Sequence, residues 1–222
     1  VTSIGDYAFE DCSGITSVTI PKGVKYIGGG AFYGCSGLTS VTIPIGVTRI
    51  GEFAFKDCKG LTSVTISNSV RTIDDYAFVN CLSLTSVTIG NNVTSIGNGV
   101  FKDCRGLTSI TIPDSLTSIS DFAFCNCRSL TSVTIGNNVT SIGDLAFDNC
   151  NKLTSVTIGN RVNSIGNSAF GGCGELTSIT YKGTRADWKD IRKGNGWRGK
   201  GSYWKVSVPE SCIVHCTDGD IG

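Results

Sequence analysis

Cysteine is the residue of this chain whose type and spacing most readily indicate chemistry. The chain holds 11 cysteines, and eight recur at a fixed interval of 23 residues: Cys12, Cys35, Cys58, Cys81, Cys104, Cys127, Cys150 and Cys173. Each ends a short stretch such as Ala54–Cys58, which reads AFKDC. A cysteine beside acidic and basic residues could be a redox thiol, a metal ligand, half of a disulfide or a nucleophile. A fixed interval, by contrast, is typical of a repeat array.

The interval argues against each reactive role for these ladder cysteines. Metal ligands converge on one point, whereas stacked repeats place one side chain in each layer. Neighbouring cysteines in such a column have parallel Cβ vectors, which is poor geometry for a disulfide. Unpaired cysteine is also among the most frequently buried residue types. We therefore predict that the eight ladder cysteines are reduced residues of the core.

Three cysteines lie outside this series. The column of Cys125 otherwise holds Glu10, Tyr33, Lys56, Val79, Lys102, Asp148 and Gly171, a set that predicts an exposed free thiol. Cys212 and Cys216 flank the only histidine, His215. A zinc site would need a fourth ligand and paired spacing, so a local disulfide or simple burial is favoured. The sequence thus predicts no metal and no other cofactor.

Residues 1–181 contain eight copies of one repeat unit. An unbroken aromatic column runs through all of them: Phe9, Phe32, Phe55, Phe78, Phe101, Phe124, Phe147 and Phe170. The segment Leu38–Ile43 (LTSVTI) alternates apolar and hydroxyl side chains, which predicts a half-buried strand. A turn, a short VxxI extended segment and the AFxxC turn complete each unit. Stacked units should pair their strands in parallel and in register.

The residue before each ladder cysteine is always Asp, Asn or Gly, as in Asp57 and Gly34. These residue types tolerate a left-handed backbone or fold back onto their own chain. The sequence around each cysteine therefore has the composition of a tight turn.

The LxxVxI strand, its Pro or Gly turn and the VxxIxxxAFxxC segment resemble the BspA-like, or treponemal-class, leucine-rich repeats of bacterial surface proteins. The resemblance covers residues 1–181. It implies a leucine-rich repeat solenoid, a right-handed β/α superhelix with a parallel β-sheet on one face and short extended, helical or 3-10 turns on the other. It also implies adhesion to host matrix proteins such as fibronectin or fibrinogen, to other bacteria or to host receptors.

The periodic pattern stops at Lys182, and residues 182–222 are expected to form a C-terminal capping segment. The segment 184–193 predicts a short helix, with Thr184 as N-cap and Asp187 at the third position of a capping box. Trp188, Ile191, Trp197 and the strand-like CIVHC segment could cover the last layer, and the closing CTDGDI resembles the tails of related repeat proteins.

The same tail offers two alternatives to a cap. Residues 182–205 carry eight basic residues, two acidic ones and all three tryptophans, so the tail could bind nucleic acid or an anionic glycan. Gly194–Gly199 matches GxGxxG, but no buried strand precedes it in a βαβ unit. A Walker-like match fails because Gly201 stands where Ser or Thr should hold magnesium. The cap is the favoured interpretation.

Candidate binding residues lie on two surfaces. The strand face presents nearly uniform hydroxyls, among them Ser40, Thr42, Ser63 and Thr65, which could bind a repetitive ligand. The turns after the strands vary, and the early repeats gather a basic, partly aromatic patch of Lys22, Lys25, Tyr26, Arg49 and Arg71. A solvated rim is the simpler interpretation of that patch.

The sequence therefore predicts a non-catalytic module, since it shows no nucleophile motif, no fixed pair of carboxylates and no cofactor fingerprint. We expect a cell-surface or secreted adhesion module of a bacterium that recognises host proteins, other cells or glycans. A net charge of +1 gives no general attraction to nucleic acid, and no apolar run approaches the ~18 residues of a membrane span. The alternative is a structural spacer or display arm of a larger surface protein. Because the chain begins at Val1 inside a repeat, upstream residues are expected to be missing.

Overall fold

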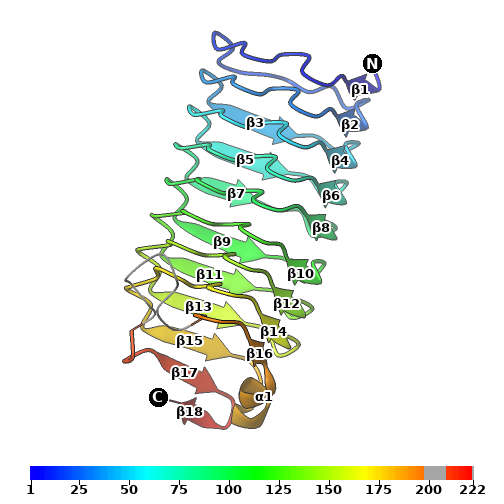
Figure 1. The fold of residues 1–222 in the computed structure, drawn as a ribbon. Helices are drawn as coiled ribbons and strands as arrows, with labels where there is room; N and C mark the ends of the chain where they lie inside the picture. Colours follow the sequence, from blue (N-terminus) through cyan, green and yellow to red (C-terminus); the bar gives the residue numbers. More distant parts are fainter. Residues whose placement is uncertain (198–208, 222) are drawn as a thin grey trace.

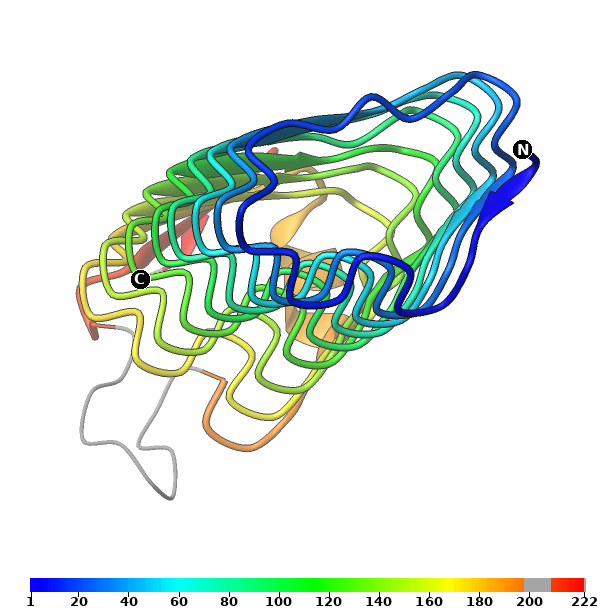
Figure 2. The ribbon, with the colours of Figure 1, turned by 90° about the horizontal axis from the view of Figure 1, so that it is seen from above.

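Successive 23-residue units form the layers of a β-solenoid in the computed structural model of the chain (Figure 1), which describes residues 1–197 and 209–221. We number the layers from 1 (residues 1–23) to 8 (residues 162–181). Each layer makes one turn, and successive turns repeat the same outline with a steady sideways offset (Figure 2). The predicted leucine-rich repeat solenoid is confirmed. Helical content is minimal. On the side opposite the long strands, where the resemblance implied extended, helical or 3-10 turns, the chain forms short strands and turns.

The LTSVTI segments form the longer strands, which pair in parallel. Val41 lies opposite Val64, one repeat later, so the predicted register is confirmed. In chain order these strands are β3 (Ser40–Ile43), β5 (Ser63–Ile66), β7 (Ser86–Thr88), β9 (Ser109–Ile112), β11 (Ser132–Ile135), β13 (Ser155–Ile158) and β15 (Ser178–Tyr181), and β17 (Ile213–Cys216) of the tail follows them. They belong to a three-stranded sheet, β3-β5-β7, and a six-stranded sheet that ends with the antiparallel β18 (Gly219–Ile221).

The VxxI segments form two-residue strands on a second flank. They are β1 (Ser3–Ile4), β2 (Tyr26–Ile27), β4 (Arg49–Ile50), β6 (Thr72–Ile73), β8 (Ser95–Ile96), β10 (Ser118–Ile119), β12 (Ser141–Ile142), β14 (Ser164–Ile165) and β16 (Arg192–Lys193). These strands also pair in parallel, in sheets of five and four strands. Their Ile side chains point inward, so the first residue of each strand from β1 to β14 lies on the outer surface.

The phenylalanine column forms the centre of the core. Neighbouring rings stack with centroids 5.1 to 5.6 Å apart. Seven of the rings, from Phe32 to Phe170, have no exposed surface. Phe9, in the first described layer, stacks on Phe32 and has 38% of its surface exposed.

The ladder thiols lie beside this column and make a regular hydrogen bond. From Cys35 to Cys173 each Sγ–H donates to the backbone carbonyl of the phenylalanine in the preceding layer, over 3.0 to 3.3 Å. These seven thiols are buried, and Cys12 in the first layer is half-buried. Burial raises the pKa of Cys104 and Cys127 well above the ordinary thiol value. The spacing that resembled a reactive motif therefore serves packing.

The prediction for Cys125 was wrong. Its side chain is 6% exposed, and burial raises its pKa to about 12. A thiol is short, and the longer side chains of Lys102 and Asp148 stand in the layers on either side of it. Layers only about 4.8 Å apart let such neighbours cover a small side chain.

Two columns in each AFxxC turn have a left-handed backbone. The residues before the ladder cysteines have φ between 53° and 71°, as their Asp, Asn and Gly composition predicted. A second column has φ between 47° and 58° and was not predicted: Tyr7, Gly30, Phe53, Tyr76, Gly99, Phe122, Leu145 and Ser168. Bulky residues such as Phe53 rarely adopt this conformation, so the repeated turn geometry overrides the local preference.

The tail continues both kinds of sheet. The predicted N-cap and capping box at Thr184 are confirmed, but helix α1 (Arg185–Asp190) is shorter than expected. The chain leaves the helix at Ile191, and β16 pairs with β14 where the prediction continued the helix. Strand β17 pairs with β15. Within the described residues no helix is long and apolar enough to cross a membrane.

The aromatic residues at the start of the tail pack onto the last layer. Trp188 is buried, with its ring 5.3 Å from Tyr181 and 5.7 Å from Trp197, measured between centroids. Lys193 Nζ donates to the carbonyls of Trp188 and Ile191. Five further basic and aromatic residues of the predicted cap lie outside the described residues: Arg198, Lys200, Tyr203, Trp204 and Lys205.

Candidate functional site

The outer column of the two-residue strands changes character in the early layers. Its members in strands β1 to β14 are Ser3, Tyr26, Arg49, Thr72, Ser95, Ser118, Ser141 and Ser164. Tyr26 and Arg49 are the departures from a Ser or Thr column, and they are direct neighbours in the β2–β4 pairing. The structure therefore brings together two residues of the predicted patch.

Arg49 is held in place from two sides. Its Nε and Nη2 atoms donate to the same oxygen of Asp74, each over 2.8 Å. Its guanidinium also lies over the Tyr26 ring, 5.8 Å from the centroid, within the range of a cation–π contact. The hydrogen bond and the charge of Asp74 raise the pKa of Arg49 above its ordinary value. The positive charge of Arg49 is thus balanced rather than available to an anion.

Beside these two residues lies a pocket of about 560 Å³ that extends over layers 1 to 5, which we name the Tyr26 pocket. Its lining comprises Asp6, Tyr7, Tyr26, Gly29, Arg49, Glu52, Phe53, Thr72, Ile73, Asp74, Asp75, Ser95 and Gly97. Three aromatic rings and four carboxylates surround a single cation in this lining. The lining contains no histidine and no cysteine.

Two of the carboxylates also have a structural role. Asp6 accepts a hydrogen bond from the backbone N–H of Gly29, and Asp75 accepts one from Asn98, each over 2.7 Å. The bonds run from one layer to the next and fix the position of each carboxylate. The pocket is therefore preorganised, with oxygen atoms held beside aromatic rings.

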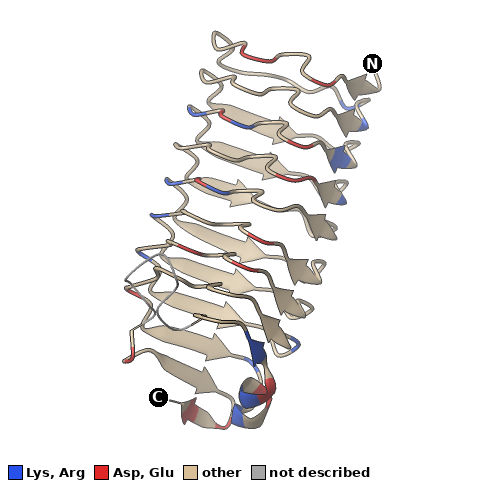
Figure 3. Ribbon diagram, in the orientation of Figure 1, with Lys and Arg blue, Asp and Glu red and all other residues tan. Residues whose placement is uncertain are grey.

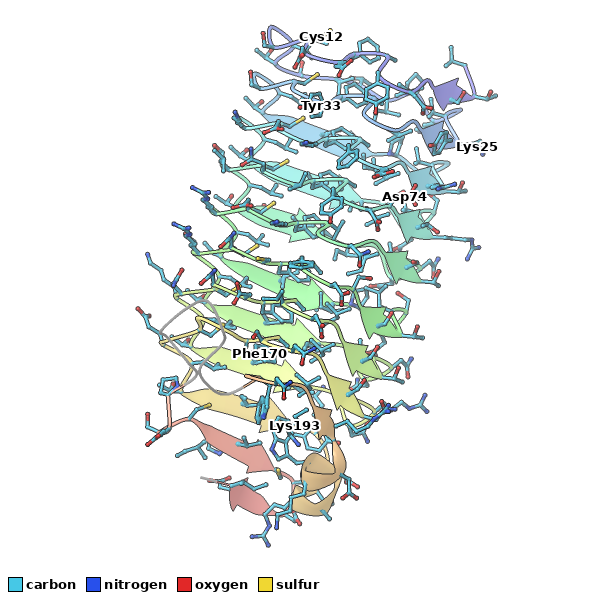
Figure 4. All side chains as sticks on the ribbon, in the orientation of Figure 1. Cys12, Lys25, Tyr33, Asp74, Phe170 and Lys193 are labelled. Carbon is cyan, nitrogen blue, oxygen red and sulfur yellow. The ribbon has the colours of Figure 1, made fainter. Side chains whose placement is uncertain are left out.

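The predicted basic patch is electrostatically mixed in the structure. Lys22, Lys25, Arg49 and Arg71 lie on the same flank as Asp6, Glu52, Asp74 and Asp75, and Figures 3 and 4 show both signs of charge there. The prediction considered the turns after the LTSVTI strands. The acidic residues follow the VxxI strands instead, so they were not part of it. Three of them stand in a column that is acidic in five of the eight layers, at Asp6, Glu52, Asp75, Asp121 and Asp144, and this column could have indicated them.

The hydroxyl residues of the prediction lie elsewhere. Ser40 pairs with Ser63 and Thr42 with Thr65 in the β3–β5 ladder, so the four side chains form one compact patch on the long-strand sheet. Ser40, Thr42 and Thr65 are exposed and Ser63 is half-buried. The structure thus does not join this patch to the Tyr26 pocket, since the two belong to different sheets.

The histidine and cysteines of the tail form no cluster of metal ligands. His215 Nδ1 lies 3.0 Å from Asp220 Oδ1 across the β17–β18 pair. Cys212 is buried, and Cys216 carries a half-buried free thiol. Across residues 1–197 and 209–221, no three His, Cys, Asp or Glu side chains are grouped so that they could hold a metal.

Comparison with known proteins gives the family. The BspA type leucine rich repeat region matches in six copies, over residues 1–108 and 71–190. The crystal structure of a T. pallidum leucine rich repeat protein is similar, with 32% identity, 69% of this chain and 72% of that chain covered, and a TM-score of 0.65. A Bacteroides ovatus leucine-rich repeat protein has 25% identity, coverage of 90% and 68%, and a TM-score of 0.45. None of the curated proteins matches the chain. On the family match and the T. pallidum relative, this chain belongs to the BspA type leucine-rich repeat family.

Proposed function

We propose that this chain is a non-catalytic binding module, displayed on or released from a bacterial surface, that binds an extended segment of a host protein through the Tyr26 pocket. The observation that carries the proposal is the break in an otherwise uniform Ser and Thr column at Tyr26 and Arg49. Layers that serve only the fold need no change of residue type in this column. A contact with a specific partner requires side chains that differ from layer to layer.

The chemistry of the pocket suits a protein segment with a basic side chain beside an apolar one. Glu52 and Asp75 provide negative charge next to the rings of Tyr7 and Phe53. Aromatic residues and arginine are the residue types that contribute most at protein interfaces. Arg49 is already oriented by Asp74, which lowers the entropy lost when a partner binds.

The test is a binding measurement on immobilised fibronectin and fibrinogen, the partner class that the family resemblance implies. The variant Tyr26→Ser/Arg49→Ser restores the Ser found in later layers, so it should fold normally and lose about tenfold or more in affinity. The matched control is Arg161→Asn, an exposed cation on a later turn whose column holds Asn138 one layer earlier. Unchanged affinity of the double variant for a protein that binds the wild type would exclude the pocket.

The second candidate function is a structural spacer or display arm. The observation in its favour is the uniformity of the later layers, where the outer column is Ser95, Ser118, Ser141 and Ser164. A spacer needs length and stiffness but no layer-specific residues. If a broad screen of matrix proteins and glycans finds no binder for the wild-type chain, the spacer becomes the better interpretation.

We also propose that residues 182–222 form a C-terminal cap of the solenoid. Two contacts support this role: Trp188 is buried against Tyr181, and β17 covers the edge strand β15. A solenoid requires such a cover because its last layer would otherwise expose apolar surface and unpaired backbone groups.

A further inference from the structure

Six cations line the opposite edge of the solenoid, at the turns that lead into the long strands. They are Lys56 and Lys59 in layer 3, Lys102 and Arg105 in layer 5, Arg128 in layer 6 and Lys152 in layer 7. Figure 3 shows blue turns along this edge, where the long strands begin. We name this surface the basic ridge. The ridge was not predicted because its members fall in three different columns, one within the AFxxC turn and two directly after it.

The ridge has an excess of positive charge. Lys59, Arg128 and Lys152 are exposed and have no ion pair within the described part of the chain. The Arg105 side chain is 49% exposed, and its Nη2 atom lies 3.3 Å from Asp103 Oδ1. The acidic residues of the same turns in these layers are Asp57, Asp103 and the buried Asp148, three against six cations. The flank that carries the Tyr26 pocket, by contrast, has four cations and four acidic residues.

Two of the cations are fixed by aromatic rings. Lys56 Nζ lies 5.1 Å from the ring centroids of both Tyr33 and Phe53, and Lys102 Nζ lies 5.5 Å from that of Phe122. Such contacts orient a flexible ammonium group without neutralising it. The ridge therefore presents positions of fixed charge rather than only mobile lysine side chains.

Layers 3 and 5 of the ridge are separated by a layer that contributes no cation to it. Layer 4 has Val79 and Leu82 where layers 3 and 5 have cations, and a depression of about 480 Å³ lies there between Lys56 and Lys102. Two layers correspond to about 10 Å along the stack. The surface is thus a row of cations over layers 3 to 7 that is interrupted once, at layer 4, which matches a linear chain that carries anionic groups at intervals.

The aromatic rings of the ridge are not available for stacking with nucleobases. Phe53 stacks on Tyr76 with centroids 5.5 Å apart, and Lys56 lies over Phe53. The Tyr76 ring packs in turn over Gly99, leaving no room there for a Cβ atom. Proteins that bind single-stranded nucleic acid need open ring faces for the bases. The ridge offers charge without a stacking platform.

We infer that the basic ridge binds a linear sulfated polysaccharide, a second ligand class on a surface whose hollow shares only Phe53 with the lining of the Tyr26 pocket. Sulfate groups would be bound by Lys59, Arg105, Arg128 and Lys152, while the hollow at Val79 in layer 4 would hold a sugar ring. The inference does not rest on the protein-binding role of the pocket.

The test is a binding measurement of the full chain on immobilised heparin. The variant Lys59→Ser/Arg105→Ser/Arg128→Ser restores the Ser that occupies the same column at Ser13 and Ser36, and its affinity should fall about tenfold or more. The matched control, Lys22→Asn/Lys25→Thr/Arg71→Thr, removes the same charge from the other flank with residue types of its own columns. It should bind heparin as the wild type does.

The remaining arms separate the possible outcomes. Desulfated heparin should bind at least about tenfold more weakly than heparin, and single-stranded DNA more weakly than heparin at the same ionic strength. The inference is overturned if the wild type does not bind heparin, if both triple variants lose affinity equally, or if DNA binds as tightly as heparin. Binding of the ridge variant to a protein partner of the pocket should be unchanged, so failure here leaves the proposed function untouched.

Discussion

The pH dependence of stability should be governed in part by Asp148. This carboxyl group is 5% exposed, and it is the charged residue that the described part of the chain buries. Burial raises its pKa from 3.8 to about 6. The folded protein therefore holds the proton more tightly than the unfolded chain does. The free energy of unfolding should fall as pH rises through the range between these two pKa values, and the loss is complete above about pH 7.

The variant Asp148→Asn measures this effect directly. A difference of about two pKa units corresponds to about 3 kcal/mol, so the variant should be more stable than the wild type by about 1–3 kcal/mol near pH 8. Near pH 4 the wild-type carboxyl is mostly protonated when folded, and the advantage should fall below about 1 kcal/mol. The Asn149 side chain donates to Asp148 Oδ2 over 2.9 Å, and an amide oxygen can accept the same bond.

Urea unfolding followed by circular dichroism at the two pH values provides the assay. The matched control is Glu175→Gln, an exposed carboxylate in the next layer, which should change stability little at either pH. An Asp148→Asn variant that is less stable than the wild type near pH 8, or equally stabilised at both pH values, would refute the burial argument.

Three further predictions concern the layers themselves. In the native protein a thiol reagent should label Cys12 and Cys216 rapidly and Cys125 only on unfolding, because the first two are half-buried and the third is buried; rapid labelling of Cys125 would contradict its position. Asn126→Val should cost about 1–2 kcal/mol in urea unfolding, since a β-branched residue is strained at φ 62°, whereas Asn126→Gly should be nearly neutral; equal costs would argue against the left-handed turn. Phe101→Ala should cost about 3–5 kcal/mol because it removes a fully buried ring from the stack, and a cost below about 1 kcal/mol would show that the column is not continuous.

The sequence could predict the fold because every layer repeats the same solution. The apolar columns, the strand alternation and the Asp, Asn or Gly before each ladder cysteine all agree, and each is repeated in layer after layer. The second left-handed column could not be predicted, since Phe53, Tyr76 and Leu145 have no preference for that backbone. There the packing of adjacent layers decides the conformation.

The site was less predictable than the fold for two physical reasons. Arg49 was expected to contribute free positive charge, but its partner Asp74 is 25 residues away in sequence and meets it only through stacking. Exposure also depends on the neighbours one layer above and below, which is why Cys125 was misjudged. The residue types in each column are enough to predict the fold. The net charge at a site can be predicted only when the residues that surround it in space are known.

The central claim is that a partner protein contacts the Tyr26 pocket, and site-specific photo-crosslinking tests it most directly. Thr72 and Ser141 stand in the same outer column, with Thr72 on the pocket and Ser141 three layers away. A photoreactive phenylalanine analogue at Thr72 should crosslink to whichever of fibronectin and fibrinogen binds the chain, and the same analogue at Ser141 should not. A partner that binds but crosslinks equally at both positions, or only at Ser141, would contradict the account.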